Sequence, residues 1–419
     1  MGPLVERVGT ARRTVPNPLP PAPSRQGRGS RGLLPRPLRE GAGGRGLEAR
    51  PATPVVRLLG ACAASLLLYA LLFGFVLDRP LAYGFLTRQI DAKLARGAAI
   101  GSPKLVILAG SNGPYSHRCE TIQPILHLPC VNGGVAVGIG LDYLFARWER
   151  RLHAGDTVYL PMEEAQYVRS RAATDLGPDA AIMFRHDWRT LARLPPDRWV
   201  GALFSFTPRY ALMALIERAL VLGGFHDPRA AAEGRTNRFG DHVGHTPALG
   251  APYRAVLARA HPFHATAAEV ASGYGTRLIA RFLRWCRAHG VRAIGGLPTE
   301  FIDDPMPRAT RAAIRAVYRA NGAAFLQLRN RSLYPRTAFF DTPDHLSQPW
   351  QGLHSRLVAR ALRRMGVARR GAPGGWCGGC ARNQVDTGGP TDDGWVTHSG
   401  RSYNAQTEAR PGFRRKTGL

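Results

Sequence analysis

A run of 20 residues without a charged side chain, Leu58–Leu77, constrains this 419-residue chain more than any other feature. At about 1.5 Å per residue, a helix of this length spans roughly the 30 Å of hydrocarbon in a bilayer. The sequence therefore predicts a transmembrane helix over 58–77. A cleaved signal peptide and a buried core helix are the alternatives, but the run is longer than a usual signal sequence, and Asp78-Arg79-Pro80 follows it instead of a small-residue cleavage site.

The charges around this run predict its orientation. Residues 1–57 carry 11 basic and 3 acidic side chains and are rich in Pro and Gly. Because basic flanks stay in the cytoplasm, we expect a disordered cytoplasmic leader at 1–57 and everything after the anchor on the periplasmic side of a bacterial inner membrane. We further expect a connecting helix and linker at 78–103, with the helix at 81–94, and a disordered tail at 369–419.

The formal net charge of +28 raises the alternative of a nucleic-acid-binding protein. Only three of the 57 basic residues are lysines, which is typical of codon bias in a GC-rich genome. The basic residues between the ends do not alternate with aromatic ones as a base-stacking surface requires. We therefore expect no nucleic-acid partner, and no pattern in the sequence predicts a cofactor.

Short apolar runs alternate with helical patterns after residue 104. The runs lie at 105–109, 157–160, 291–297 and 338–340, and helices are predicted at 273–289 and 308–321, each followed by a Gly that fits a C-cap. This alternation predicts an α/β domain over 104–368 with a mainly parallel sheet covered on both faces. The irregular segment at about 169–263 is interpreted as an insertion over the site.

Two clusters near the ends of this domain carry residues suited to chemistry. Gly110-Ser111-Asn112-Gly113 directly follows the first strand, where a tight turn exposes a hydroxyl and backbone N–H groups. Late in the domain, Asp341 and Asp344 precede His345, a pattern in which a carboxylate orients a general base. Taken singly, the first cluster is also an ordinary turn, and the second is also a capped helix with a surface histidine.

Taken together, the two clusters resemble the SGNH hydrolase superfamily, and specifically its membrane-anchored branch of DltD and alginate O-acetylation type proteins. The resemblance implies a flavodoxin-like three-layer α/β sandwich, with Ser111 as nucleophile and His345 as base. The family's Asp stands three residues before the His. Here Thr342 holds that position, so the orienting carboxylate is Asp341 or Asp344, and Asp341 is favoured because it directly follows the predicted strand.

The resemblance also implies an oxyanion hole near Ser111. Asn112 adjoins the nucleophile, and Gly133 or Gly134 is the candidate for the family's backbone donor, although a plain turn explains those glycines equally well. The family's third donor, an Asn, has no match, since Glu163 and Glu164 stand at the corresponding strand end. A carboxylate at Glu163 opposes an oxyanion unless it is protonated or binds a substrate hydroxyl.

The function implied is that of an anchored esterase or O-acyltransferase acting on a cell-envelope or exported glycan, with a membrane acyltransferase as a candidate partner. The alternative is a non-catalytic scaffold or binding partner of a polysaccharide-modifying complex. No metal is expected, because the histidines at 226, 242, 245, 261 and 264 match no ligand spacing. Cys119 and Cys130 form a candidate disulfide outside the membrane. Cys377 and Cys380 form a single CxxC without the context of a metal or redox site.

Overall fold

The computed structural model describes residues 54–225 and 235–368, so the predicted tail and nearly all of the predicted leader lie outside the described residues. The chain forms two compact units, Met1–Leu67 and Leu68–Leu419. Within the described part, one helix is long and apolar enough to cross a membrane, Pro54–Val76, made of α1 (Pro54–Leu71) and the π-helical turn η1 (Leu72–Val76). This helix contains nearly all of the predicted span 58–77 and fits a single-pass anchor.

The second unit is a mixed α/β fold around a five-stranded parallel sheet in the order β2-β1-β3-β4-β6. This confirms the predicted class and the mainly parallel sheet. A small separate sheet pairs two further strands in parallel. The strands are β1 (Leu105–Ile107), β2 (Cys130–Asn132), β3 (Thr157–Leu160), β4 (Arg292–Gly295), β5 (Glu300–Phe301), β6 (Ala324–Phe325) and β7 (Leu333–Tyr334).

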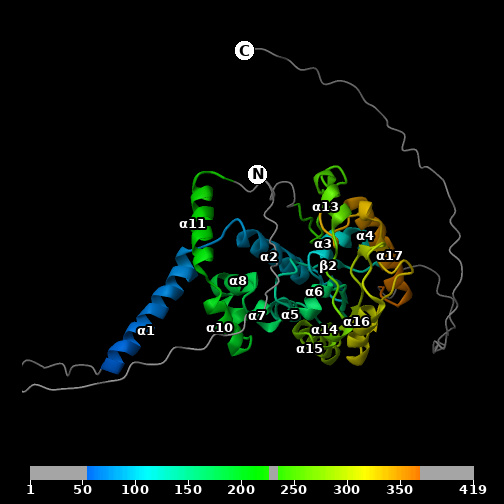
Figure 1. The fold of residues 1–419 in the computed structure, drawn as a ribbon. Coiled ribbons are helices and arrows are strands. Elements are labelled where there is room, and N and C mark those ends of the chain that lie inside the picture. Colours follow the sequence, from blue (N-terminus) through cyan, green and yellow to red (C-terminus); the bar gives the residue numbers. More distant parts are fainter. Residues whose placement is uncertain (1–53, 226–234, 369–419) are drawn as a thin grey trace, which may run out of the picture. The chain divides into compact units, whose positions relative to one another are not determined.

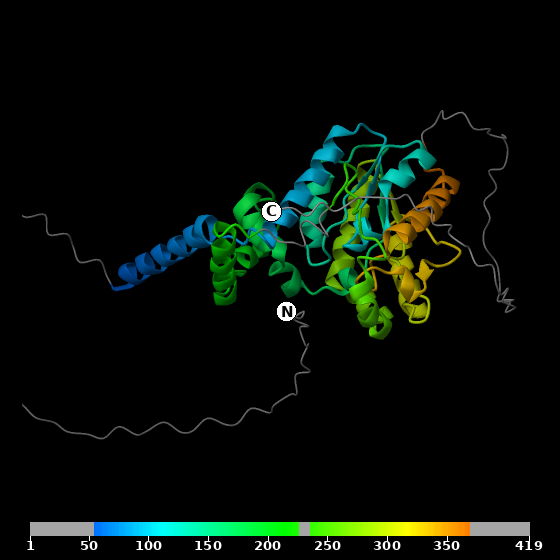
Figure 2. The same cartoon turned by 90° about the horizontal axis from the view of Figure 1, so that it is seen from above.

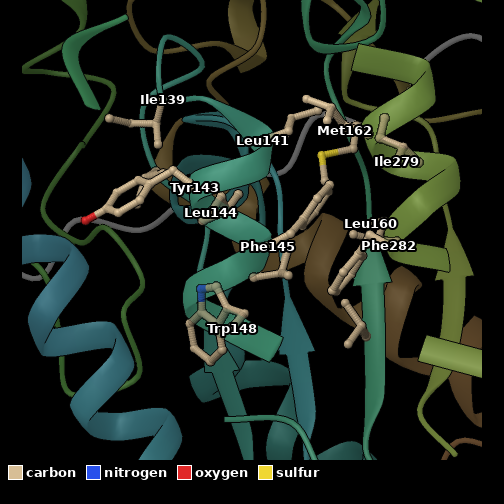
Figure 3. Packing of buried hydrophobic residues seen from close by; sticks show 14 of the residues in the cluster. Ile139, Leu141, Tyr143, Leu144, Phe145, Trp148, Leu160, Met162, Ile279 and Phe282 are labelled. Carbon is tan, nitrogen blue, oxygen red and sulfur yellow. The ribbon is translucent and has the colours of Figure 1, made fainter. Parts of the chain in front are cut away.

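Helices bury both faces of the five-stranded sheet, because alternate residues of a strand point to opposite sides. Val106 and Val158 pack with α5 (Leu141–Glu149), α15 (Tyr274–Ala288) and α16 (Arg308–Ala320). Leu105 and Ile107 pack on the other face with α4 (Cys119–Leu126) and α17 (Gln348–Arg364). In the first cluster the rings of Phe145 and Phe282 stack with their centroids 4.1 Å apart (Figure 3).

Several predicted helices are confirmed, with differences at their ends. Both α15 and α16 end close to the predicted Gly residues, Gly290 and Gly322, which have positive φ angles of 66° and 76°. The connecting helix α2 (Tyr83–Ala99) runs beyond the predicted 81–94, because its last turns are rich in alanine, a strong helix former. The last helix, α17, begins at Gln348 with Pro349 in its first turn.

The strand predicted at 338–340 is wrong. A short 3-10 helix, η3 (Arg336–Ala338), stands there, and Phe339 forms only an isolated antiparallel bridge with Leu346. The physical reason is local: the Ala338 carbonyl accepts hydrogen bonds from both the backbone N–H and the hydroxyl of Ser347, so the segment folds back on its own loop. The fifth strand of the sheet is β6 instead.

The segment 169–263 divides into two parts around the undescribed residues 226–234. Its first part is helical, and α8, α10 and α11 lie at the side of the domain away from α17 (Figures 1 and 2). Its second part runs past the carboxyl ends of the strands. The remaining helices are α3 (Asn112–Ser116), α6 (Glu164–Val168), α7 (Arg171–Asp175), α8 (Pro178–His186), α9 (Trp188–Leu191), α10 (Pro196–Phe204), α11 (Pro208–Leu222), η2 (Ala251–Tyr253), α13 (Arg254–Arg259) and α14 (Ala267–Ser272).

A disulfide joins Cys119, at the start of α4, to Cys130, at the start of β2, the pair that the sequence offers as a candidate. Replacing both cysteines with alanine is expected to lower the free energy of unfolding by about 3 kcal/mol, because the bridge restricts the unfolded chain over a separation of 11 residues. Urea unfolding of the full chain in detergent measures this. Unchanged stability of the double variant under oxidising conditions contradicts the expectation.

Candidate functional site

The candidate site lies at the carboxyl ends of β1 and β3, where the strand order of the sheet changes direction. The chain passes from β1 to β2 on one side and then to β3 on the other, so the loops after β1 and β3 diverge. In open parallel sheets, ligands bind outside the carboxyl ends of the strands at such a switch point. Ser111 comes shortly after β1 and Glu163 shortly after β3, which places both residues there.

Ser111 contacts the carboxyl group of Glu163. The Ser111 hydroxyl donates to Glu163 Oε1 at 3.4 Å, and the backbone N–H of Asn112 donates to the same oxygen at 3.1 Å. A Cβ atom at Gly110 would lie only 2.2 Å from Glu163 Oε1, so glycine leaves the room that this carboxyl group needs. Glu163 thereby occupies the donors beside the first turn of α3, and this position is called the anion position below.

The protonation of Glu163 depends on two opposed effects. Its side chain is buried, which raises the pKa of the carboxyl group, while the N–H and O–H donors of Ser111 and Asn112 lower it. Burial is the larger effect, so the pKa of Glu163 is raised. A neutral Glu163 is therefore populated at higher pH than for an ordinary glutamate, and in that form it carries a proton to donate.

The Asn112 side chain has a structural contact. Its Nδ2 donates to the carbonyl of Pro161 at 2.7 Å and so ties the turn after β1 to the end of β3. Its Oδ1 is buried and has no hydrogen-bond partner among the described residues. Of the groups of Asn112, the backbone N–H is therefore the one that faces Glu163 and the anion position.

Gly133 and Gly134 do not offer free amides to an oxyanion. The N–H of Gly133 donates to the carbonyl of Ile107 at 2.8 Å, and that of Gly134 donates to Asn132 Oδ1 at 3.3 Å. A Cβ on Gly133 would come within 2.5 Å of Trp148, and one on Gly134 within 2.9 Å of backbone atoms in the Ser111 turn. These contacts favour the packing role of the two glycines over the predicted donor role.

The connecting helix also reaches this loop. Lys93 of α2 is 2% exposed, and its Nζ donates to the carbonyl of Gly134. Burial lowers the pKa of Lys93 to about 7, while the charge of Asp241 opposes that shift. The segment between the apolar helix and the sheet is therefore part of the folded body.

His345 is paired with Asp341, the favoured one of the two candidate carboxylates. Its Nδ1 donates to Asp341 Oδ1 at 2.7 Å. The imidazole is 8% exposed and lies flat against the ring of Tyr115, with centroids 4.0 Å apart and planes at 9°. Because Tyr115 belongs to α3, this stacking holds His345 against the helix that directly follows Ser111.

Among the described residues, no hydrogen bond joins Ser111 to His345. Asp344 does not orient the histidine either. Its backbone carbonyl accepts from the hydroxyls of Ser116 and Thr299, at 2.9 and 3.1 Å, and its side chain lines a pocket. Burial, followed by the charge of Glu163, raises the pKa of Asp344 to about 8, while His345 opposes the shift.

This pocket has a volume of about 220 Å³ and lies beside the Ser111–Glu163 contact. Four carboxyl groups line it: Glu163, Glu164, Glu300 and Asp344. Glu164 accepts from His264 Nδ1 at 3.0 Å. Glu300 accepts the N–H of Met306 on Oε2 at 3.0 Å, whereas its buried Oε1 has no hydrogen-bond partner among the described residues. The pocket is thus rich in acceptors for hydroxyl or other donor groups.

Sequence reasoning missed the aromatic support of His345. The ring of Tyr115 is enclosed between His345 and His242, whose centroid is 4.1 Å away, and His245 lies 5.3 Å from it. Burial lowers the pKa of His242 to about 3 and that of His245 to about 4, so both are neutral rings at neutral pH. No spacing in the sequence relates these histidines to Tyr115, because the contact depends on the path of the 235–263 segment.

The clustered histidines form no metal centre in the described ranges 54–225 and 235–368. No group of three or more His, Cys, Asp or Glu side chains there is arranged to hold a metal ion. His264 contacts Glu164 and Asp304, and His261 is mostly exposed. His226 and Asp227, together with Cys377 and Cys380, lie outside the described residues.

Glu300→Gln is expected to remove a pH dependence of stability. Burial raises the pKa of Glu300 from 4.5 to about 7, so the folded protein binds this proton more tightly than the unfolded chain. The free energy of unfolding therefore falls as pH rises from about 4.5 to about 7, and the variant should exceed the native protein by about 3 kcal/mol at pH 8. Urea unfolding at pH 5 and pH 8 tests this, and an unchanged native-to-variant difference at the two pH values rules it out.

Comparisons with known proteins add little to this geometry. No family model and no curated protein matches the sequence. The crystal structure of the protein YxiM from Bacillus subtilis is similar at a TM-score of 0.33 and 12% sequence identity, over 64% of this chain and 58% of YxiM. The matched part is less than two thirds of the length of YxiM.

Proposed function

We propose that this protein is a membrane-anchored, extracytoplasmic SGNH-like esterase or O-acyltransferase that acts on a cell-envelope or exported polysaccharide. One observation carries the proposal. Ser111 stands at the switch point of a parallel sheet, next to a pocket of about 220 Å³, and its helix holds the His345–Asp341 pair. A serine, a carboxylate-oriented histidine and a pocket are the parts that acyl transfer requires.

The architecture supports this assignment. Counted along the main sheet, the strand order is 2-1-3-4-5, with helices on both faces, which favours the flavodoxin-like three-layer arrangement. The apolar helix Pro54–Val76 and the basic leader favour an inner-membrane anchor with a cytoplasmic N-terminus and a periplasmic domain. The Cys119–Cys130 disulfide fits an oxidising compartment of this kind.

The proposed reaction uses these residues in two steps. The Ser111 hydroxyl attacks the acyl carbonyl while His345 takes its proton, and Asp341 holds the imidazole in the required tautomer. The alcohol leaves with the proton from His345, and an acyl-serine remains. Water or a sugar hydroxyl then attacks that ester, gives its proton to His345 and restores Ser111. Catalytic hydrogen bonds in empty sites are often long or unmade and tighten when substrate binds.

The proposed reaction requires that the Glu163 carboxylate does not occupy the anion position. The N–H groups at Ser111 and Asn112 can stabilise an oxyanion only when Glu163 is neutral or has moved away, because its carboxylate competes for the same donors. Sugar hydroxyls suit the remaining carboxyl groups of the pocket, which accept hydrogen bonds. A membrane acyltransferase is the proposed partner that supplies the acyl group on the outer side.

The second candidate is a non-catalytic scaffold or binding partner of a polysaccharide-modifying complex. A specific observation favours it: Glu163 fills the anion position, and the amides of Gly133 and Gly134 are engaged within the fold. In that case the pocket binds a glycan without attacking it. The two candidates differ in whether Ser111 is an activated nucleophile.

A serine-reactive fluorophosphonate distinguishes them. The full-length protein in detergent is labelled beside Ser111→Ala and His345→Ala, with Ser272→Ala, an exposed helix serine, as the matched control. We expect labelling of the native protein and the control and its loss in both site variants. If the folded native protein is not labelled, the scaffold function is favoured and the enzyme proposal fails.

A further inference from the structure

The α10–α11 pair exposes an unusual amount of apolar surface. Leu215 is 56% exposed and Leu222 81%, and they belong to a larger set of exposed apolar side chains on α11 that also includes Leu212, Ile216, Leu220 and Val221. Trp199, Val200 and Phe204 of α10 are exposed as well. Extended apolar patches on soluble surfaces are rare and mark contacts with proteins or membranes.

The exposed side chains of α11 other than Val221 form a stripe opposite the packed face of the helix. At about 100° per residue, positions 212, 215, 216, 219 and 220 share one side of a helix. Tyr210 and Ala214, on the other side, are buried in a cluster with Phe73 and Phe206. One side of α11 therefore belongs to the domain, and the other side is apolar without being covered by the described residues.

The apolar helix Pro54–Val76 ends against α11. Phe73, in its last turn, stacks on Phe206 with centroids 4.6 Å apart, and Arg218 of α11 donates to the carbonyl of Val76 at 3.0 Å. In that same turn Phe75 is 78% exposed. The exposed surface of α11 thus adjoins the end of the helix that we assign to the membrane.

We propose that the exposed stripe of α11 lies in the lipid headgroup and upper acyl region of the same leaflet in which the apolar helix ends. The inference rests on the proposed membrane anchor. Lipid suits the stripe because its outer side chains are aliphatic, while Arg218 at its border can extend to lipid phosphates. A helix that packs on the protein with one side and exposes an apolar side can lie along the surface of a bilayer, and here the anchor holds it in place.

The test uses an environment-sensitive NBD dye on single cysteines in the full-length protein. Cys62, Cys377 and Cys380 are first replaced by alanine, while the bridged pair and the buried Cys286 stay. The protein is reconstituted into phosphatidylcholine–phosphatidylglycerol vesicles, with and without lipids brominated close to the headgroup. The dye is placed at Leu215.

Two further positions separate failure of the inference from failure of the anchor. Leu67 lies in the apolar helix, and Ile302, 59% exposed, lies in the loop after β5. We expect a blue-shifted dye at 215 that is quenched by bromine close to the headgroup, a blue-shifted dye at 67 that is quenched by bromine deep in the acyl chains, and neither change at 302. Quenching at 67 without quenching at 215 overturns the inference and leaves the anchor intact. Lack of quenching at 67, with lipid more deeply brominated included, overturns the anchor itself.

The dye at 215 gives a different result if protein covers the stripe or if the helices enter the bilayer deeply. A blue shift at 215 without bromine quenching shows that protein, such as a second copy of this chain, covers the stripe, and this also overturns the inference. Quenching at 215 only by lipid brominated deep in the acyl chains shows that α10 and α11 enter as a bent span and not as a surface helix. As a matched check, Leu215→Glu should remove the quenching of a dye at Leu212 while that at Leu67 persists.

Discussion

Glu163→Gln is expected to speed fluorophosphonate labelling of Ser111 by about a hundredfold at a pH where Glu163 is ionised, because it removes a negative charge from beside the reacting oxygen. Glu163 Oε1 accepts from the Ser111 hydroxyl at 3.4 Å and from the N–H of Asn112 at 3.1 Å. A carboxylate there repels the developing oxyanion, whereas a carboxamide keeps the shape without the charge. The second-order labelling rate of each protein is the measurement.

The pH dependence of this effect has a definite sign. Because the pKa of Glu163 is raised, its carboxyl is neutral at low pH and ionises as pH rises, so the rate advantage of the variant grows with pH and vanishes below that pKa. Glu164→Gln is the matched control, since Glu164 accepts hydrogen bonds from His264 and Ala265 and none from Ser111 in the described part of the chain. A Glu163→Gln protein that is labelled more slowly than the native protein at the highest pH tested shows that the Glu163 carboxyl assists Ser111, and the proposed competition is then wrong.

Arg198→Met is expected to lower the free energy of unfolding by about 4 kcal/mol, because removing one partner of a buried ion pair leaves an uncompensated charge. Arg198 is fully buried on α10, and its guanidinium contacts the carboxylates of Asp142 and Asp179. Burial raises the pKa of Asp179, and Arg198 opposes that shift. Without the cation, both acids must be protonated or hydrated in the interior. Urea unfolding at pH 7 measures the loss.

Arg171→Met is the control for this prediction. Arg171 is 57% exposed and pairs with Asp197 at the surface, where an ion pair contributes at most about 1 kcal/mol. Adding Asp142→Asn and Asp179→Asn to Arg198→Met should restore part of the stability, since the unpaired charges are then absent. Equal losses in Arg171→Met and Arg198→Met contradict the assignment of Arg198 as the buried cation of this cluster.

Parts of the fold were predictable where the sequence pattern lies in contiguous residues, and were not where the structure depends on contacts between separate segments. The apolar helix, α15 and α16 were predictable because length, periodicity and a terminal Gly are properties of contiguous residues. The strand expected at 338–340 was not, since Ser347 hydrogen-bonds the Ala338 carbonyl and diverts the segment into a loop. Apolar runs of three residues carry too little information to separate a strand from such a loop.

In the candidate site, too, contacts between nearby residues were predictable and contacts between distant segments were not. The pairing of His345 with one of two nearby carboxylates was predictable from their spacing, whereas the contact of Ser111 with Glu163 depends on two strands becoming neighbours across the switch point. The stack of Tyr115 between His242 and His345 joins three distant segments and leaves no pattern in the sequence. The engaged amides of Gly133 and Gly134 likewise follow from tertiary packing.

The buried contact of Lys93 with Gly134 has a mechanical consequence. Force transmitted along the chain past the contacts of the apolar helix with α11 would reach α2, and Lys93 joins α2 directly to the loop that packs against the Ser111 turn. A tether of this kind is stiff at its protein end. Tension on the anchor would therefore be transmitted to the loop beside Ser111 while the sheet stays folded.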